Sequence, residues 1–387
     1  MLDCPSACGP LLPLMDDLSK ATLVYAGTYT GAPGTTSKGI YFFRLQTENL
    51  EVSQNITLAP LGLAVESPSP SFLAADLKAR RIYAVNELQQ FQSKPGGAVS
   101  AFAIDPATGK LTLLNQQPSM GTDPCHIALD KDRRHAIVAN YSSGSVAVLP
   151  IQADGKLGPA TDVVQHQGKS VHPQRQTGPH AHCATIDPAG TFVFVCDLGL
   201  DKILAYRFDA AAGKLTPHTP AFTAVKPGSG PRHMVFSPDG TFAYVANELT
   251  STIVVFAYDA AAGTLKELQT VSTLPEYYDG PNTVAEIDVH KSGQWVYVSN
   301  RGHNSVVLFS VERGKGTLTY VEEQGTGGAK PRHFGMEPSM RHLAIGNQDS
   351  NTVLVCRIDP GNGRLKPSGV FASVGSPACI LFVPPAE

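Results

Sequence analysis

The sequence predicts an all-β fold, a seven-bladed β-propeller with four antiparallel strands in each blade. Three observations predict it. A strand pair that ends in a polar residue recurs along the chain, four strand signals separated by tight turns fill each repeat, and no stretch shows helical periodicity. A repeat of this size with four strands is typical of propellers. The polar residues that end the second strand of each copy are Thr28, Asn86, Asn140, Asp197, Asn247, Asn300 and Asn347.

The fifth copy shows the four predicted strands most clearly. They run from His233 to Phe236, from Phe242 to Ala246, from Thr252 to Tyr258 and from Leu265 to Val271. The third strand is apolar on both faces, as expected for a sheet that packs between two neighbouring blades. Turns with Asp at the start or Gly at the end join the strands, which is favourable turn chemistry.

The two ends of the chain predict how the ring closes. The first copy has no innermost strand of its own before Thr22, whereas the segment from Pro377 to Val383 is an innermost strand with no partner after it. We expect this C-terminal strand to complete the first blade, because ring closure removes free sheet edges. An eighth, partial blade is the less favoured alternative. The expected organisation is a flexible leader, residues 1–21, and one propeller domain, residues 22–387.

The composition limits the classes of partner. The 387 residues carry a formal net charge of −3, so charge gives no reason to expect nucleic acid or an anionic membrane as a partner. No apolar run approaches the roughly 20 residues that a transmembrane helix needs. The leader lacks the basic start and long apolar core of a signal peptide, and we expect a cytoplasmic protein.

The cysteines predict neither disulfides nor a metal centre. Cys4 and Cys8 have no second pair at metal-ligand spacing, so no zinc site is expected there. The five cysteines beyond the leader lie in strand-like surroundings, where small buried thiols are expected. They are Cys125, Cys183, Cys196, Cys356 and Cys379.

Strand direction places two sets of positions on one face of the propeller. The connection into the innermost strand and the loop after the second strand lie together there, and the innermost strands ring the channel mouth. By analogy with other propellers, we expect the ligand at this mouth. Ionisable residues at these positions indicate a functional site. They are Arg232, Arg332, His126, His182, His233, His333 and Glu286 at the starts of innermost strands, and Glu87, Glu248 and Arg301 after second strands.

Structural roles compete with this interpretation. Any one of the three histidines that share a register could bind a loop carbonyl, and the register itself could serve as a latch between blades. Glu87 and Glu248 could form ion pairs with arginines of other blades. For Arg232 and Arg332 we favour anion binding, because a guanidinium group can hold a phosphate or carboxylate through two hydrogen bonds.

A long polar loop, residues 165–182, precedes the fourth copy. We expect it to form a lid or a wall of the pocket, and therefore a pocket displaced toward blades four to seven. A solvated surface excursion is the alternative. His180 and His182 could chelate a metal with Glu248, but no acidic cluster accompanies them, and no metal is expected. The ionisable residues of the loop are His166, Lys169, His172, Arg175, His180 and His182.

Seven short motifs together make the sequence recognisable. They run from Ser37 to Tyr41, Gly178 to His182, Asp197 to Asp201, Gly230 to His233, Asn247 to Leu249, Ser299 to Gly302 and Lys330 to Phe334. With these motifs the chain resembles the seven-bladed propeller lactonases, a family that includes bacterial 6-phosphogluconolactonases and fungal carboxymuconate lactonizing enzymes. The resemblance runs from about Tyr25 to the end of the chain.

The resemblance implies a set of site residues. The lactonizing branch uses a histidine, a glutamate and two arginines in its proposed active site. By motif these fall on Glu248, Arg232, Arg301 and either His182 or His180, and the match does not decide between the two histidines. We assign His182, Glu248, Arg232 and Arg301 to catalysis. The expected substrate-binding residues are His180, His126, His233, Glu286, Arg332, His333, Arg175 and Glu87.

The leading hypothesis is hydrolysis of a sugar δ-lactone, with 6-phosphogluconolactone as the substrate. Arg232, Arg301 or Arg332 would hold the phosphate. His182 would act as general base, because the unperturbed pKa of histidine, about 6.5, suits neutral pH. Glu248 could orient this histidine or act as the base itself. No Gly-x-Ser-x-Gly motif is present, which disfavours a serine nucleophile.

Two other functions remain open at the level of sequence. The same pocket could catalyse cycloisomerisation of a carboxylated muconate or open a different lactone, since phosphate and carboxylate both select arginine. A non-catalytic propeller that binds peptides or proteins would leave the clustered His, Arg and Glu residues unexplained. The favoured hypothesis implies a small anionic lactone as partner, no cofactor, no metal and a monomeric protein.

Overall fold

The computed structural model describes residues 18–31, 34–47 and 56–385. The first 17 residues of the expected leader, with Cys4 and Cys8, lie outside the described residues. Within the rest of that segment, Leu18–Lys20 forms a short 3-10 helix, η1. Leu18 is buried, and its backbone N–H donates to the carbonyl of Ala107 in the second blade.

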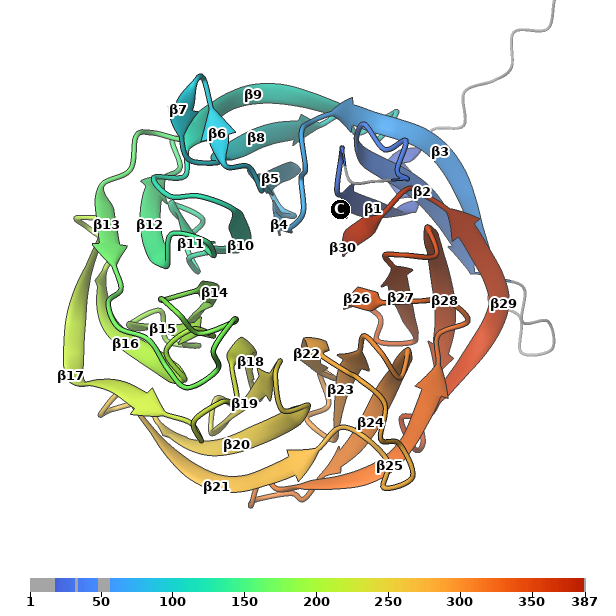
Figure 1. Cartoon of the computed structure of the whole chain (residues 1–387). Coiled ribbons are helices and arrows are strands. Elements are labelled where there is room, and N and C mark those ends of the chain that lie inside the picture. The colour runs from blue at the N-terminus through green and yellow to red at the C-terminus, as the bar shows by residue number, and fades with distance from the viewer. Residues whose placement is uncertain (1–17, 32–33, 48–55, 386–387) are drawn as a thin grey trace, which may run out of the picture.

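Seven four-stranded antiparallel sheets form a ring around a central channel (Figure 1). From the channel outward, the first blade consists of β30 (Pro377–Val383), β1 (Thr22–Thr28), β2 (Gly39–Thr47) and β3 (Ile56–Glu66). The second blade consists of β4 (Leu73–Asp76), β5 (Arg81–Asn86), β8 (Ala98–Ile104) and β9 (Leu111–Pro118), with a small hairpin, β6 (Gln90–Phe91) and β7 (Lys94–Pro95), between β5 and β8. The third consists of β10 (Pro124–Leu129), β11 (His135–Asn140), β12 (Ser145–Pro150) and β13 (Asp162–Gln165).

The remaining four blades follow the chain in order. The fourth consists of β14 (Ala181–Ile186), β15 (Phe192–Asp197), β16 (Lys202–Asp209) and β17 (Lys214–Ala224). The fifth consists of β18 (Pro231–Phe236), β19 (Phe242–Asn247), β20 (Thr252–Asp259) and β21 (Thr264–Ser272). The sixth consists of β22 (Val284–Val289), β23 (Trp295–Asn300), β24 (Ser305–Val311) and β25 (Leu318–Gly325). The seventh consists of β26 (Pro331–Met336), β27 (His342–Asn347), β28 (Thr352–Ile358) and β29 (Leu365–Ser373).

The predicted fold is confirmed. The ring has seven blades, and the C-terminal strand β30 pairs with β1 to complete the first blade, with Leu23 opposite Val383 and Ala26 opposite Ile380. The four strands of the fifth blade match their predicted bounds to within two residues. Across the described residues, no helix is long and apolar enough to cross a lipid bilayer.

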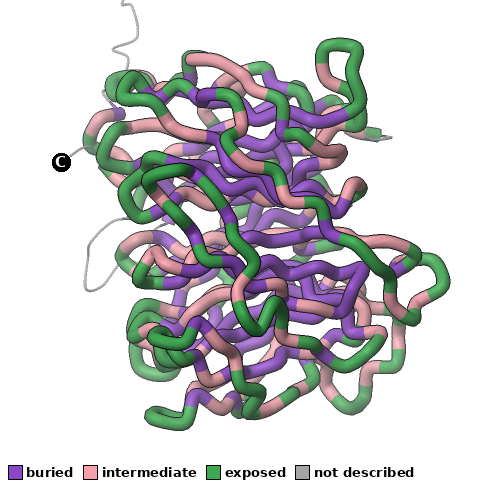
Figure 2. Tube along the Cα trace, turned by 90° about the vertical axis from the view of Figure 1, so that its left-hand side faces the viewer, coloured by how far each residue is buried: buried purple, intermediate pink, exposed green. Residues whose placement is uncertain are grey.

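The hydrophobic core lies between blades. Figure 2 shows buried residues along the strands and exposed residues mainly in the connecting loops. Each apolar cluster joins adjacent sheets. For example, Tyr244 and Val255 of the fifth blade pack with Val296 and Phe309 of the sixth. This sandwiching explains why the central strands are apolar on both faces. The five cysteines expected to be buried thiols are buried and free.

The repeated polar residue at the end of each second strand is a structural anchor. All seven are fully buried. Asn140, Asn300 and Asn347 each donate from Nδ2 to a backbone carbonyl in the segment that leads into their own blade, at 2.9 to 3.0 Å. These bonds tie the entry segment to the end of the second strand, and they therefore fix where each innermost strand starts at the channel mouth.

Candidate active site

The start of the innermost strand is bulged in most blades. In β10, β14, β18 and β26 the pairing with the second strand shifts register by one residue. A bulge leaves one extra residue unpaired and re-aims side chains. The residues at the shift are Cys125, His182, Arg232 and Arg332, followed by His126, Cys183, His233 and His333. We call the first position of each pair, from Cys125 to Arg332, the upper set, and the second position, from His126 to His333, the lower set. Both sets lie near the channel.

The upper set opens onto a cavity of about 190 Å³. Its walls come from the innermost strands and from the loops that follow the second strands, and one residue comes from the long loop before blade four. Six blades contribute, and six of the eight lining residues are Arg, Glu or His. The lining residues are Glu87, Cys125, Tyr141, Arg175, His182, Glu248, Arg301 and Arg332.

One wall of the cavity is a carboxylate held by three guanidinium groups. Glu248 Oε2 accepts from Arg301 Nη2 at 2.7 Å and from Arg232 Nε at 3.1 Å, and Oε1 accepts from Arg175 Nη2 at 2.5 Å. Burial alone would raise the pKa of Glu248, but Arg301, Arg232 and Arg175 outweigh it and lower that pKa to about 2. Glu248 is therefore a structural anion, and its low basicity makes it a poor proton acceptor.

The opposite wall holds a second carboxylate, Glu87, whose hydrogen-bond partners and pKa shift differ from those of Glu248. Glu87 Oε2 accepts from Ser71 Oγ at 2.5 Å and from Tyr29 Oη at 2.9 Å. Oε1 accepts no hydrogen bond from the described residues. Burial raises the pKa of Glu87, although Arg332, Ser71 and Tyr29 oppose the shift. The two glutamates of one cavity thus have pKa values displaced in opposite directions.

Arg332 differs from the other arginines of the site. Its guanidinium lies over the ring of Tyr29, 5.1 Å from the centroid, and makes no hydrogen bond or ion pair with the described residues. Burial lowers its pKa, but Tyr29, Glu87 and Glu248 outweigh this and raise it, so the group stays charged. Arg332 is therefore the guanidinium whose donors are available to a bound anion.

His182 lies at the cavity between these walls. Its Nδ1 is 3.8 Å from Cys125 Sγ, and the edge of Tyr141 packs against its ring. Burial, followed by the charge of Arg232, lowers the pKa of His182 well below its usual range. The imidazole is therefore neutral. Its Nε2 makes no hydrogen bond with the described residues.

The loop before blade four is a wall of the cavity, as expected. His166 is clamped to Asp197 at 2.6 Å, and both side chains are fully buried. Gln176 donates from Nε2 to the carbonyl of Leu198, which holds the middle of the loop. The loop delivers Arg175, which is 37% exposed and also donates to Tyr141 Oη at 3.1 Å.

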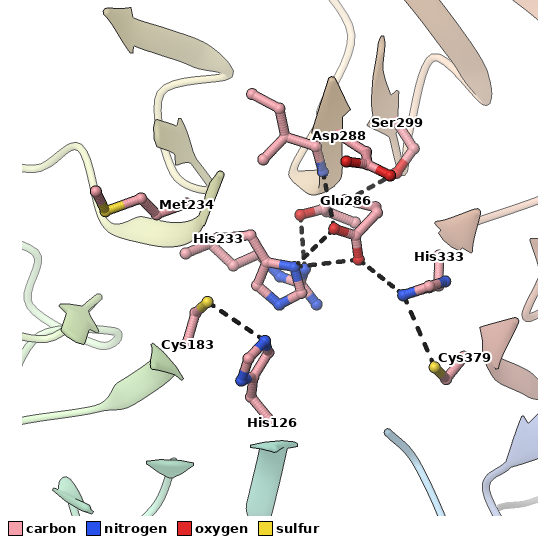
Figure 3. A network of polar contacts seen from close by, with 12 residues as sticks. His126, Cys183, His233, Met234, Glu286, Asp288, Ser299, His333 and Cys379 are labelled. Carbon is pink, nitrogen blue, oxygen red and sulfur yellow. Dashed lines mark hydrogen bonds and ion pairs between the residues drawn. The ribbon is translucent and has the colours of Figure 1, made fainter. Parts of the chain in front are cut away.

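Three of the expected substrate-binding residues, His126, His233 and His333, lie in the lower set, and a fourth, Glu286, contacts two of them (Figure 3). Glu286 accepts from His233 Nδ1 and pairs with His333 Nε2, both at 3.1 Å, while His126 Nε2 lies 3.4 Å from Cys183 Sγ. Burial raises the pKa of Glu286 and lowers that of all three histidines, that of His333 to about 4. His233 and Glu286 are buried, His126 and His333 are partly buried, and none of the four lines the cavity.

The structure separates the two candidate histidines. His182 lines the cavity, whereas His180 stacks on the ring of Tyr141 at 4.5 Å between centroids and bonds the Tyr141 carbonyl through Nδ1. Because the two rings lie against different parts of Tyr141, they do not converge on one point. Among the described residues, no group of three or more His, Cys, Asp or Glu is arranged to hold a metal.

The predicted site is only partly the observed cavity. His182, Glu248, Arg301, Arg332, Arg175 and Glu87 line it, and Arg232 lies behind Glu248 with its Nη1 bonded to the carbonyl of Ala285. The expected displacement toward blades four to seven holds in part. Five of the eight lining residues come from these blades or the loop before blade four, whereas Glu87, Cys125 and Tyr141 come from blades two and three. Sequence reasoning missed Tyr29, Ser71, Cys125 and Tyr141. These residues occupy the same repeat positions, and that register was the available signal.

An all-β ring with a cavity of guanidinium groups, carboxylates and a neutral histidine defines a propeller of enzyme type. Comparison with known families extends this. The model of the family "Lactonase, 7-bladed beta-propeller" matches residues 23–382. The chain belongs to this family.

Several relatives are similar over nearly their full length. A 6-phosphogluconolactonase of Bacillus subtilis is 34% identical over 93% of this chain and 97% of its own. One from Formosa agariphila is 31% identical over 89% and 94%. Among solved structures, the periplasmic gluconolactonase of Pseudomonas aeruginosa superposes with a TM-score of 0.85 at 34% identity, covering 94% of this chain and 99% of that one.

Proposed function

We propose that this protein hydrolyses the ester bond of a sugar δ-lactone, and that 6-phosphogluconolactone is its preferred substrate. The observation that carries the proposal is the charge of the cavity. Four guanidinium groups, those of Arg175, Arg232, Arg301 and Arg332, surround two carboxylates, which leaves an excess of at least two positive charges. A buried excess of this size favours a doubly charged anion such as a phosphate monoester.

The arrangement supports a division of roles. Arg332, the guanidinium without a protein partner, would bind the phosphate. His182 Nε2 would take a proton from water as the water attacks the lactone carbonyl carbon, in the role of general base. Arg301 lies at the cavity and would stabilise negative charge on the carbonyl oxygen. Glu248 would hold Arg175, Arg232 and Arg301 in place rather than move a proton.

The test compares lactones with and without the phosphate. Wild-type protein is expected to hydrolyse freshly prepared 6-phosphogluconolactone with a lower KM than unphosphorylated gluconolactone, and a muconolactone is expected to be a poor substrate. Arg332→Met should raise KM for the phosphorylated lactone by about tenfold, the effect of losing about 1.5 kcal/mol from a hydrogen bond to a charged group. It should change KM for gluconolactone much less.

Glu267→Gln provides a control for this test. Glu267 is exposed on β21, the outermost strand of its blade, and does not line the cavity, so the variant should match wild type on every substrate. Equal losses on both sugar lactones in Arg332→Met would contradict phosphate binding by Arg332. Absence of turnover of all three lactones by the wild type would contradict the function itself.

The cellular setting is part of the same proposal. We infer a cytoplasmic, monomeric enzyme whose partner is a small anionic lactone rather than nucleic acid or a membrane. The near-balanced charge of the chain supports this choice of partner. Fractionation of the native host would test the location, which matters because the Pseudomonas aeruginosa relative is described as periplasmic. Light scattering would test the monomeric state.

A further inference from the structure

Hydrolysis of a lactone needs a second proton transfer, for which the roles above name no donor. Water loses a proton when it attacks the carbonyl carbon, and the ring oxygen gains one when it leaves as a hydroxyl group. An alkoxide is a poor leaving group unless it takes up a proton as it departs. A side chain that can hold a proton next to the ring oxygen would therefore accelerate the second step.

We propose that Glu87 is the general acid of this reaction and donates a proton from Oε1 to the ring oxygen of the lactone. The inference rests on the proposed hydrolysis and deepens it. Glu87 lines the same cavity as His182. Its two oxygens are in different situations, because Ser71 and Tyr29 both donate to Oε2 while Oε1 has no partner among the described residues. The proton-carrying oxygen is thus the one left for the substrate.

The place of Glu87 beside Arg332 fits the covalent structure of the proposed substrate. The phosphate is attached to C6, and the neighbouring carbon, C5, carries the ring oxygen. The group that binds the phosphate and the group that protonates the ring oxygen must therefore lie side by side. Tyr29 contacts both candidates, donating to Glu87 at 2.9 Å and lying under the guanidinium of Arg332. Glu87 and Arg332 form no ion pair within 4 Å, which leaves their facing atoms available to a ligand.

The other carboxylate of the cavity cannot take this role. Both oxygens of Glu248 accept hydrogen bonds from arginines, which hold it ionised. The ionisable groups that face Glu87 are Tyr29, Arg332, Asp123 and Cys125, and only Arg332 carries a positive charge. Burial raises the pKa of Glu87, whereas burial lowers that of His182. A carboxyl group and a neutral imidazole displaced in this way are suited to act as acid and base, respectively.

The proposed step conserves atoms and charge. Water adds to the carbonyl carbon and gives its proton to His182 Nε2. The bond between the carbonyl carbon and the ring oxygen breaks, its electron pair goes to the ring oxygen, and that oxygen takes the proton of Glu87. The new carboxylic acid and the imidazolium of His182 each release a proton to solvent, and Glu87 regains one, so the net reaction is lactone plus water to hydroxy carboxylate plus one proton.

Glu87→Gln tests the proposal. Glutamine has nearly the same shape, and its carbonyl oxygen can still accept from Ser71 and Tyr29, but it cannot donate a proton and become an anion. With 6-phosphogluconolactone, kcat should fall by about 100-fold or more, with KM close to wild type. The alkaline limb of the wild-type profile of kcat/KM against pH, corrected for uncatalysed hydrolysis, should be missing in the variant. Glu267→Gln is the matched control and should retain the wild-type profile.

A second variant keeps the test independent of folding defects in the first. Tyr29→Phe removes a hydrogen bond that lowers the pKa of Glu87, so the alkaline limb should move to higher pH. An active wild type with kcat of Glu87→Gln within about threefold of it, or with an unmoved alkaline limb in Tyr29→Phe, overturns the role of Glu87 and leaves the lactonase function standing. A wild type that hydrolyses none of the lactones overturns both.

Discussion

At the scale of single residues, environment rather than residue type separates the two glutamates of the cavity. Three guanidinium groups lower the pKa of Glu248 to about 2 in spite of its burial, whereas burial dominates at Glu87 and raises its pKa. Glu248 compensates the positive charges of guanidinium groups that would otherwise repel one another, since only 2% of the Arg232 side chain and 11% of the Arg301 side chain are exposed. Glu248 should therefore contribute to the stability of the folded protein as well as to the chemistry of the site.

Glu248→Gln should destabilise the protein at neutral pH. Removing one member of a buried ionic network leaves uncompensated charge and typically costs about 3–5 kcal/mol. The free energy of unfolding, measured with denaturant at pH 7, should fall by an amount of this order, whereas Glu267→Gln should leave it unchanged. An unchanged midpoint for Glu248→Gln would show that the three arginines do not depend on this carboxylate.

The same pair of proteins gives a pH dependence. The folded-state pKa of Glu248, about 2, lies below its ordinary value of 4.5, so its contribution to stability is complete above about pH 4.5 and is lost as pH falls toward 2. This contribution is about 3 kcal/mol at most. The wild type should therefore lose more stability than Glu248→Gln between these two pH values. Parallel curves for the two proteins would contradict the assignment.

At the scale of elements, buried contacts of the loop before blade four hold a residue of that loop at the cavity. It brings Arg175 to the cavity, and its position depends on the buried pair of His166 and Asp197. Asp197 is also the anchor of β15 and accepts from the backbone N–H groups of His180, Gly199 and Leu200. One carboxylate thus fixes both ends of the segment that carries Arg175.

His166→Ala should loosen this loop without unfolding the ring. The change leaves Asp197 Oδ2 buried without its partner, which costs about 1–3 kcal/mol. Amide hydrogen exchange in residues 166–180 should accelerate, and KM for the lactone should rise because Arg175 is no longer held at the cavity. Lys169→Ala, an exposed change in the same loop, is the control. Wild-type exchange rates in His166→Ala would contradict the clamp.

Local patterns explain which elements could be predicted from the sequence. Alternation of apolar residues and turn chemistry act over a few residues, so the strands of the fifth blade were predicted to within two residues. The lining of the cavity depends on contacts between residues that are distant in sequence. Arg232 turns toward Glu248 and the carbonyl of Ala285 instead of the open cavity, and the lower histidines do not line the cavity. An alignment of the repeats places each residue on the ring, but it does not predict the direction in which the side chain points.

At the scale of the whole molecule, the ring brings together residues that are distant in sequence. The repeat alignment favoured blades four to seven, but ring closure places blade one beside blade seven, and Tyr29 and Glu87 thereby lie close to Arg332. The closing strand also supports the channel, since the backbone N–H of Ile380 donates to His333 Nδ1 at 3.2 Å. The site therefore depends on the joint between the two ends of the chain.

Deleting residues 376–387 should destroy this joint. Without β30, the first blade loses its innermost strand, β1 gains a free edge, and the apolar contacts of Ile380 and Phe382 with the seventh blade disappear. Thermal unfolding should occur at a much lower temperature, lactonase activity should be lost, and light scattering should show association through the open edge. Deleting only residues 385–387 keeps β30 and the hydrogen bond from Arg80 to the carbonyl of Pro384, and it should behave as wild type. A stable, monomeric and active form of the longer deletion would mean that seven blades hold together without the closing strand.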